Sequence, residues 1–268
     1  MQTKRITFFL GAEGLPSWLI KFIHNQLMAF NGSATLLKIQ TLQQVNVRDY
    51  LNAMTLAFQP FDLCQIILCG SKADIFESMV KRTLVEDCFL IEKNTKTTPQ
   101  HLNFDNFYFQ FFNITNELAA FNRLLHSVSL NEQTKNIEIE KAFVLQWVAK
   151  HANHIQQKNL REQLIQRESI SSTGMQDGIA FPHILSDRVK KPQLICITTD
   201  KPIQWHSTMG SVTHIIGLVL PKPCQTEALS GVRNLATKLV NEDFRLFITQ
   251  HHTSAELQVI LSCLMGKI

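Results

Sequence analysis

One short stretch, SSTGMQDGIAFPHILSDRV, places a histidine in a setting suited to chemistry. Gly174 and Gly178 allow backbone torsions that other residues avoid, and they let a ligand approach the chain closely. Phe181 is expected to be extended because it precedes a proline, and Pro182 fixes the backbone just before His183. The pattern predicts a stiffly held imidazole beside glycine-rich backbone.

Such a histidine suits the transfer of a phosphoryl group. A neutral imidazole nitrogen can attack phosphorus, and an ordinary histidine, with a pKa of about 6.5, is largely neutral at pH 7. The protein then has to align the donor and acceptor and to neutralise the phosphoryl oxygens, for which backbone N–H groups and an arginine are suited. Taken alone, a Pro-His pair is more often structural, so the surrounding pattern has to decide.

Other chemistries have less support in the sequence. The six cysteines are never closer than five positions apart, which excludes a CxxC pair, and most lie in apolar runs typical of buried thiols. No GxG, GxxxxGK[ST] or GxSxG motif occurs. His151 and His154 have a spacing that fits a metal on a helix, but without a third ligand a solvated helix face is the better interpretation. We therefore expect neither a metal nor a cofactor.

Length and composition describe an ordinary folded chain. Its 268 residues allow two modest domains, and 45% hydrophobic with 18% charged residues exclude a disordered polyelectrolyte. The net charge of +4 is spread thinly, so no nucleic-acid partner is indicated. We see no signal peptide and no run of about 20 apolar residues, so we expect a cytoplasmic protein without direct membrane insertion.

The N-terminal part alternates between strand and helix patterns. The predicted order is strand 5–10, helix 16–30, strands 33–39 and 42–47, helix 48–58, strand 62–70 and helix 71–84, the last begun by Ser71.

This order, together with VNVRDYLNAMTLAFQPFDLCQIILCGSKADIFESMV, resembles the phosphocarrier protein HPr of the bacterial sugar phosphotransferase system. The resemblance covers residues 1–91 and implies an open-faced β-sandwich. HPr carries Gly-Leu-His-Ala-Arg-Pro at the start of its first helix, but here Gly14 and Leu15 are followed by Pro16, with Trp18 at the arginine position. Because proline has no side-chain nucleophile, the resemblance implies an HPr-like domain without the phosphoryl acceptor.

Asp49 stands where many HPr relatives have a serine that a regulatory kinase modifies. One interpretation is that Asp49 caps the short helix, a contribution of about 0.5–2 kcal/mol. The other is a permanent mimic of the phosphorylated serine. Substituting Asp49 by alanine and comparing partner binding with stability would separate them.

Residues 92–135 are less regular. A polar stretch leads into the aromatic run 104–112, and residues 113–127 resemble a capped amphipathic helix. Because the run is too apolar for a free tether, we interpret 92–135 as a connector docked on one of the domains.

Residues 136–268 read as helices flanking buried strands, which predicts a mixed-sheet α/β domain. The helix patterns cover 139–155, 159–169, 229–250 and 254–265, and the strands cover 193–199 and 212–220. Within this domain, REQLIQRESISSTGMQDGIAFPH, followed by KPIQWHSTMGSVTHIIGLVLP, resembles enzyme IIA of the fructose, mannitol and nitrogen-regulatory class.

The resemblance assigns roles to individual residues. It implies that His183 is the phosphoryl acceptor and that Arg167 lies near the active site. Glu168, Thr173 and Gly178 belong to the same motif as shaping residues, although for Glu168 and Thr173 a purely structural role at a helix end and a turn is an equal alternative.

Two departures from that family matter. The second histidine that usually lies near the acceptor is replaced by Ala228, and the acidic residue before the glycine of the tryptophan loop is replaced by Met209. Loss of the second histidine weakens the surroundings of a phosphoryl group. His206 and His214 are conceivable substitutes, but we interpret His206 as a loop residue and His214 as a core residue.

The resemblances together imply a phosphotransferase-system phosphocarrier: His183 accepts phosphate from phospho-HPr and passes it to a permease IIB domain or keeps it as a signal for a regulatory protein. The alternative is a regulatory binding module in which the HPr-like domain mimics or blocks the docking of HPr. A pair of inert scaffolds is a third possibility.

Overall fold

The computed structural model describes residues 2–92, 107–128, 133–205, 207–251 and 253–266. Internal contacts divide the chain into two compact units, Met1–Asn103 with Val259–Gly266, and Phe104–Gln258. The second unit therefore starts earlier than the boundary at residue 136 that we expected from the sequence. It also ends before the chain does, because the last turns of the final helix are grouped with the first unit.

The first unit is an antiparallel sheet with helices. Its elements are β1 (Gln2–Leu10), α1 (Ser17–Leu27), β2 (Gly32–Lys38), β3 (Gln43–Asn46), α2 (Tyr50–Thr55), β4 (Leu63–Gly70), α3 (Ala73–Leu84) and β5 (Cys88–Ile91). The strand order is β3-β2-β4-β1-β5. The predicted order of elements is confirmed, and β5 is an additional edge strand that the sequence reading missed.

The core of this unit follows from residue spacing. Alternate residues of β1 and β4, such as Phe8 and Ile66, are buried with Leu19 and Ile23 of α1 and Val80 of α3. One face of the sheet therefore packs against α1 and α3, as strand and helix periodicities require.

The start of α3 differs from the expectation. The helix begins at Ala73, because Lys72 takes a left-handed conformation with φ of 60° and so precedes the helix, and Ser71 is not its cap. At α2, by contrast, Asp49 is the N-cap, and its side chain accepts a hydrogen bond from the backbone N–H of Asn52. The predicted capping role of Asp49 is confirmed.

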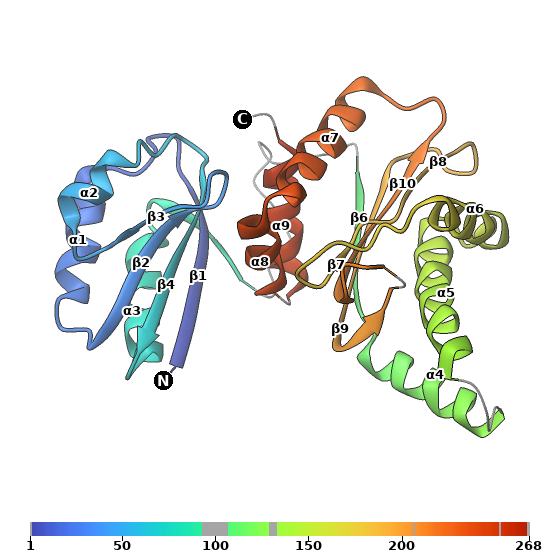
Figure 1. Ribbon diagram of the computed structural model, residues 1–268. Coiled ribbons are helices and arrows are strands. Elements are labelled where there is room, and N and C mark those ends of the chain that lie inside the picture. The colour runs from blue at the N-terminus through green and yellow to red at the C-terminus, as the bar shows by residue number, and fades with distance from the viewer. Residues whose placement is uncertain (1, 93–106, 129–132, 206, 252, 267–268) are drawn as a thin grey trace. The chain divides into compact units, whose positions relative to one another are not determined.

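The second unit is built on a mixed sheet. Its elements are β6 (Tyr108–Asn113), α4 (Thr115–Val128), α5 (Gln133–Ala152), α6 (Gln157–Ile170), β7 (Ile179–Ala180), β8 (His183–Ser186), β9 (Gln193–Gln204), β10 (Ser211–Pro221), α7 (Thr226–Val240) and α8 (Glu242–Thr249), with α9 (Ser254–Met265) following (Figure 1). The strand order is β6-β9-β10-β7, and β8 also pairs with β10. β9 and β10 are antiparallel, whereas β6, β7 and β8 pair in parallel, so the predicted mixed sheet is confirmed.

The aromatic run that we interpreted as part of a connector is largely strand β6. It pairs with β9 from Tyr108 opposite Gln193 to Asn113 opposite Thr198. The partner strand is more than eighty residues away in sequence, so no local signal marks this pairing. The segment is a structural part of the second unit, and α4 follows it where the sequence predicts a helix.

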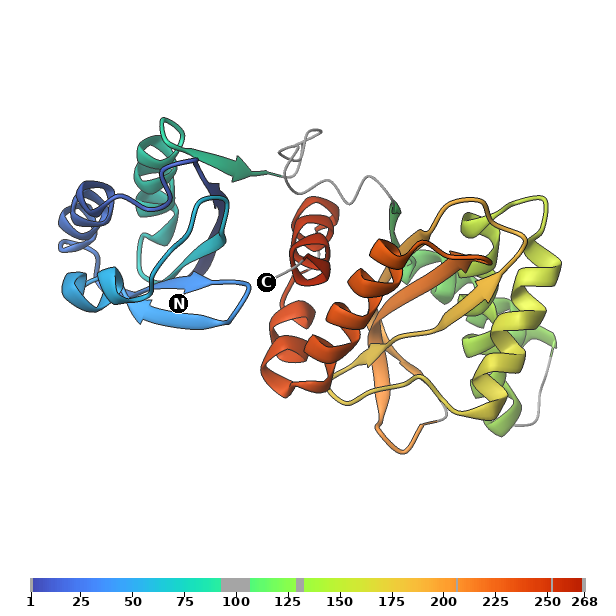
Figure 2. The same cartoon turned by 90° about the horizontal axis from the view of Figure 1, so that it is seen from above.

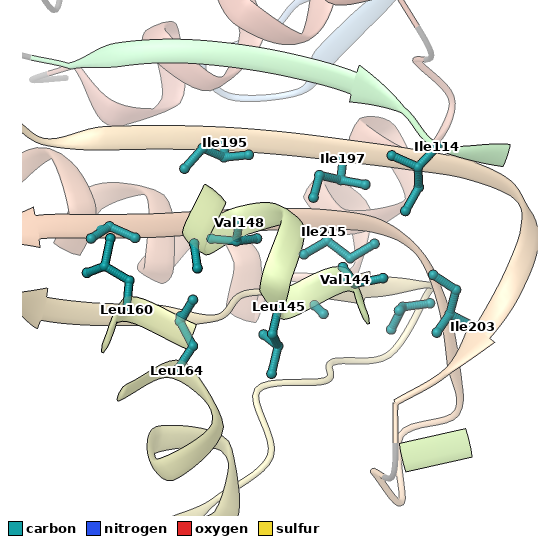
Figure 3. Close-up of a cluster of buried hydrophobic side chains, with 14 of the residues drawn as sticks. Ile114, Val144, Leu145, Val148, Leu160, Leu164, Ile195, Ile197, Ile203 and Ile215 are labelled. Atoms are coloured by element: carbon teal, nitrogen blue, oxygen red, sulfur yellow. The ribbon is translucent and has the colours of Figure 1, made fainter. Parts of the chain in front are cut away.

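Helices cover both faces of this sheet. α5 and α6 lie on one side and α7 and α8 on the other (Figure 2). On the α5 side, Val144, Leu145 and Val148 meet Ile195 and Ile215 of the strands (Figure 3). Leu160 and Leu164 of α6 join the same cluster, which fixes α6 and its C-terminal residues against the sheet.

The helical pattern over residues 229–250 is interrupted in the structure. α7 ends at Val240, and Asn241 takes an extended conformation and caps α8 through a hydrogen bond from Asp243 N–H to its side-chain oxygen. Acidic residues directly after an asparagine are a helix-start signal that marks this break.

The cysteines are free thiols, as expected. Cys64, Cys88, Cys196 and Cys263 are buried. Burial raises the pKa of Cys196 to about 12, so this thiol is not a nucleophile at neutral pH. None of the helices in the described part of the chain combines the length and apolar character needed to cross a bilayer.

Candidate functional site

His183 is the first residue of β8 and is held by the sheet. β7 and β8 pair in parallel with β10, on either side of Phe181 and Pro182. The carbonyl of Pro182 accepts a hydrogen bond from Leu218 N–H at 2.9 Å, and His183 lies opposite Leu218 in the register. The backbone that carries the histidine is therefore fixed on both sides of Pro182.

The imidazole of His183 is oriented by its own chain. Its Nδ1 lies 2.8 Å from the carbonyl oxygen of Phe181. Because a carbonyl oxygen only accepts, Nδ1 carries the proton, and Nε2 keeps its lone pair in the neutral ring. The half-buried side chain thus presents Nε2 as the nucleophilic atom.

Arg167 is brought to this nitrogen by the last turn of α6. Its Nη2 lies 3.5 Å from Nε2 of His183, and its Nη1 donates to the carbonyl of Ser171 at 2.9 Å. The guanidinium is thereby tethered at one nitrogen and directed to the histidine with the other. An arginine held in this way can bind phosphoryl oxygens at Nε2.

Glu168 and Thr173, expected as shaping residues, bind each other. Glu168 is 7% exposed and accepts hydrogen bonds from the hydroxyl and the backbone N–H of Thr173. Its carboxylate also pairs with Lys141 of α5, with Nζ 2.6 Å from Oε2. This network ties α5 and α6 to the loop before β7. Lys141 was missed by sequence reasoning, since nothing local connects it with Glu168.

The turn at Gly178 needs a glycine and is braced by a buried arginine. Gly178 has φ of +78°, and a Cβ there would lie 3.1 Å from the Thr213 hydroxyl. The preceding Asp177, at φ of 59°, accepts a hydrogen bond from Arg245 Nε at 2.9 Å. Arg245 also donates to the carbonyls of Leu239 and Val240, at the end of α7. Arg245 was a second residue that sequence reasoning missed.

The other side of the loop lies against Trp205. A Cβ on Gly174 would be 2.9 Å from the indole Cδ1, so the backbone passes close to this ring. The carbonyl of Trp205 accepts hydrogen bonds from Ser172 Oγ at 3.4 Å and Lys141 Nζ at 3.3 Å. The loop between α6 and β7 is therefore anchored at Glu168, Trp205 and Arg245.

Several other candidates lie elsewhere. His214 is 1% exposed and donates from Nε2 to the carbonyl of His251, which confirms that it is a core residue. Ala228 is fully buried in the first turn of α7. Met209 is 49% exposed. His206 lies outside the described residues.

His151 does not lie on a solvated helix face, so that expectation is wrong. Its ring stacks on Trp147, with centroids 5.1 Å apart, and meets Phe112 at 3.9 Å. Burial, together with Lys150 and His154, lowers the pKa of His151 below its usual range. Only His154 of the pair is exposed.

Comparison with known proteins connects this arrangement to a family. A family model described as "Phosphoenolpyruvate-dependent sugar phosphotransferase system, EIIA 2" matches residues 115–263, more than half of the chain. The chain belongs to this family, and the second unit is an enzyme IIA domain, a component of a phosphotransferase system. The resemblance to enzyme IIA seen in the sequence is thus confirmed, although the match begins before residue 136.

Individual relatives are similar over parts of the chain. Multiphosphoryl transfer protein 1 of Escherichia coli K12 is 38% identical over 93 residues, 34% of this chain and 11% of the relative. The match thus spans about a tenth of that protein's length. A nitrogen regulatory protein of Pseudomonas aeruginosa is 28% identical over 122 residues, 45% of this chain and 79% of that protein.

Among solved structures, nitrogen regulatory protein IIA-Ntr from Neisseria meningitidis is similar at 24% identity with a TM-score of 0.39. The alignment covers 44% of this chain and 84% of that chain.

Proposed function

We propose that the protein is a phosphocarrier that accepts a phosphoryl group from phospho-HPr on Nε2 of His183. The observation that carries this proposal is the pair of contacts on the ring: Nδ1 is tied to the Phe181 carbonyl, and Nε2 lies beside Arg167. Membership in the enzyme IIA family supports the same reaction class.

The transfer needs no proton to leave the attacking nitrogen. In the neutral ring, the lone pair of Nε2 attacks phosphorus, the new P–N bond forms, and the P–N bond to the donor histidine breaks. Nδ1 keeps its proton throughout, and this N–H stays hydrogen-bonded to the Phe181 carbonyl. Arg167, anchored on Ser171, neutralises charge on the phosphoryl oxygens as they arrive.

Onward transfer is to a permease IIB domain, or the phosphoryl group remains as a signal to a regulatory protein. Ala228, at the place of the usual second histidine, supports the signalling outcome, because this position offers no donor to a phosphoryl group on His183. The similarity to a nitrogen regulatory protein of Pseudomonas aeruginosa supports the signalling outcome as well.

For the first unit, we propose an HPr-like domain without an acceptor. Its strand and helix order and the motif GLPSWL support this assignment. A second function, a binding module that mimics or blocks HPr docking, is favoured by one observation: Trp18, next to the lost acceptor position, is 54% exposed at the start of α1. Phe22 and Met79, 50% and 37% exposed, line the same hollow as Trp18, and such a contiguous exposed apolar patch is typical of an interaction surface.

The test is to incubate the full chain with phosphoenolpyruvate, the general phosphotransferase enzyme and HPr, and to measure acid-labile phosphate. Wild type is expected to be labelled, and His183→Ala is not. His154→Ala, an exposed histidine of the same unit, is the control and stays labelled. Label that persists in His183→Ala overturns the site, and an unlabelled wild type supports the binding-module function.

A permease-dependent sugar phosphorylation assay then separates the two fates of the phosphoryl group. Sugar phosphate formed at a rate that depends on His183 indicates transport. A protein that is labelled but supports no sugar phosphorylation is a signalling component.

A further inference from the structure

A cavity of about 850 Å³ lies between α4, α5 and α6, wholly within the second unit. Its wall includes Ser171 and Ser172, at the C-terminal end of α6, but not His183. Cavities of roughly 300–1,000 Å³ are typical of small-molecule sites. The cavity is therefore large enough for a ligand and separate from the histidine that the proposed function uses.

One wall of the cavity is aromatic and aliphatic. Phe121 of α4 and Phe143 of α5 stack with their ring centroids 4.3 Å apart and their planes 19° from parallel. Ile139 and Ile165 extend the same apolar wall. A ring or branched aliphatic group is the partner that such a wall favours.

The lining of the cavity also contains one positive charge that has no partner among the residues that the structure describes. Lys141 and Glu168 satisfy each other at 2.6 Å, so this pair adds no net charge. Arg161, on the same face of α6 as Ile165 and Glu168, has a buried Nε with no hydrogen-bond partner. Among the described residues, no carboxylate forms an ion pair with it.

An unpaired buried donor is costly and needs an explanation. Most structures satisfy such a group with an acceptor, and a guanidinium binds carboxylates and phosphates in bidentate fashion. Ser171 lines the same cavity, and its hydroxyl group can donate to a second oxygen. The polar groups of the cavity thus match an oxyanion, and its apolar wall matches a hydrophobic body.

We propose that this cavity binds a small organic anion with an apolar body, its carboxylate or phosphate on Arg161 and its body against Phe121 and Phe143. Carboxylates and phosphate monoesters share the chemistry that Arg161 recognises. This site is additional to the phosphoryl acceptor and does not depend on it.

Binding is measured by titration calorimetry on the full-length protein with two probes, 3-phenylpropionate and phenyl phosphate. The neutral analogue 3-phenyl-1-propanol keeps the body and removes the charge. At least one anion is expected to bind at millimolar concentration or below, and the alcohol about tenfold more weakly. In parallel, the ¹⁵N–¹H resonance of Arg161 Nε is expected to shift on addition of the anion.

The probe that binds identifies the source of the oxyanion. Binding of 3-phenylpropionate alone assigns a carboxylate ligand, binding of phenyl phosphate alone assigns a phosphate ester, and each supports the site. No binding of either anion up to roughly 10 mM overturns the proposal, as does an alcohol that binds as tightly as the anions.

Variants test the residues. Arg161→Gln is expected to weaken anion binding by about tenfold, whereas Arg233→Gln, an exposed arginine of α7, leaves it unchanged. Ala142→Phe, which fills the cavity from α5, is expected to abolish binding of all three probes. Thermal unfolding confirms that each variant is folded. If Ala142→Phe does not fold, Arg161→Gln alone decides, and an unchanged affinity in Arg161→Gln contradicts the proposal.

Discussion

The two units use proline differently at or next to the candidate acceptor position. In the first, Pro16 stands where the resemblance to HPr places an acceptor histidine, and it precedes α1 as an N-cap with φ of −69° and ψ of 145°. In the second, Pro182 precedes His183 and fixes the strand that presents it. In both units the proline restricts the backbone, but only the second unit supplies a nucleophile next to it. A rigid backbone therefore does not by itself make a site.

Among the described residues, each unit also contains one largely buried lysine–carboxylate pair. Lys38 and Asp62 are 2.7 Å apart in the first unit, and Lys141 and Glu168 are 2.6 Å apart in the second. Asp62 also accepts from the backbone N–H of Gln59, whereas Glu168 holds Thr173 in the loop that leads to His183. The same interaction thus stabilises a turn in one unit and the candidate site in the other.

The largest expected effect is the loss of stability when the carboxylate of either pair is removed. Glu168→Ala leaves the charge of Lys141 buried without a carboxylate to neutralise it, so the free energy of unfolding of the second unit should fall by about 3–5 kcal/mol. Asp62→Ala should destabilise the first unit by a similar amount. Amide hydrogen exchange, which reports each unit separately, measures both losses.

Phosphorylation then distinguishes the pairs. Under conditions where both variants stay folded, Glu168→Ala should slow labelling of His183, and Asp62→Ala should not. An equal slowing in the two variants would show that the network around Glu168 has no special connection to the site.

The next largest expected effect is that of Arg167→Gln on the rate of phosphoryl transfer. Removing the guanidinium beside Nε2 should slow phosphoryl transfer by about 100-fold with little change in stability, because one positioned charge is lost from the transition state. Arg82→Gln, an exposed arginine in the last turn of α3 in the first unit, is the matched control. Single-turnover labelling measures both rates, and a normal rate in Arg167→Gln contradicts the assigned role.

Asp177→Asn tests the ion pair between Asp177 and Arg245, which holds the turn before β7. The amide still tolerates the left-handed backbone but loses the charge that pairs with Arg245, so a destabilisation of about 1 kcal/mol is expected. Asp187→Asn, at an exposed aspartate, should change stability by much less. Urea unfolding and hydrogen exchange at β7 and β8 compare the stability of the two variants. An equal loss of stability in both would contradict a stabilising role of the pair between Asp177 and Arg245.

The smallest effect concerns pH and is confined to the second unit. The pKa of His151 is lowered in the folded state, so below the usual value of 6.5 the unfolded chain binds a proton that the folded one does not. Stability is therefore full above pH 6.5 and falls as the pH drops below it. His151→Phe should remove this part of the pH dependence, whereas His154→Phe should keep most of it, because burial is the largest cause of the lowered pKa.

The sequence predicted what is local. Helical spacing predicted α5 and α6, and alternation and apolar runs predicted β9 and β10. These features depend on residues within one or two turns of each other, where periodicity and turn chemistry act.

What the sequence did not predict depends on distant partners. Arg245 meets Asp177 across 68 residues, and Lys141 meets Glu168 across the whole of the α5–α6 hairpin. β6 is a strand because it pairs with β9. Its own side chains do not alternate between buried and exposed. Only the break at Asn241 had a local signal, the capping asparagine followed by two acidic residues.

Pro182 has a further consequence for the edge of the sheet. β7 and β8 form one edge of the described sheet, and the proline between them removes a backbone donor and interrupts the strand. An edge broken in this way is a poor template for a strand from another molecule. The residue that holds the histidine in place thus also protects the protein against aggregation by strand addition, so replacing it would affect solubility as well as chemistry.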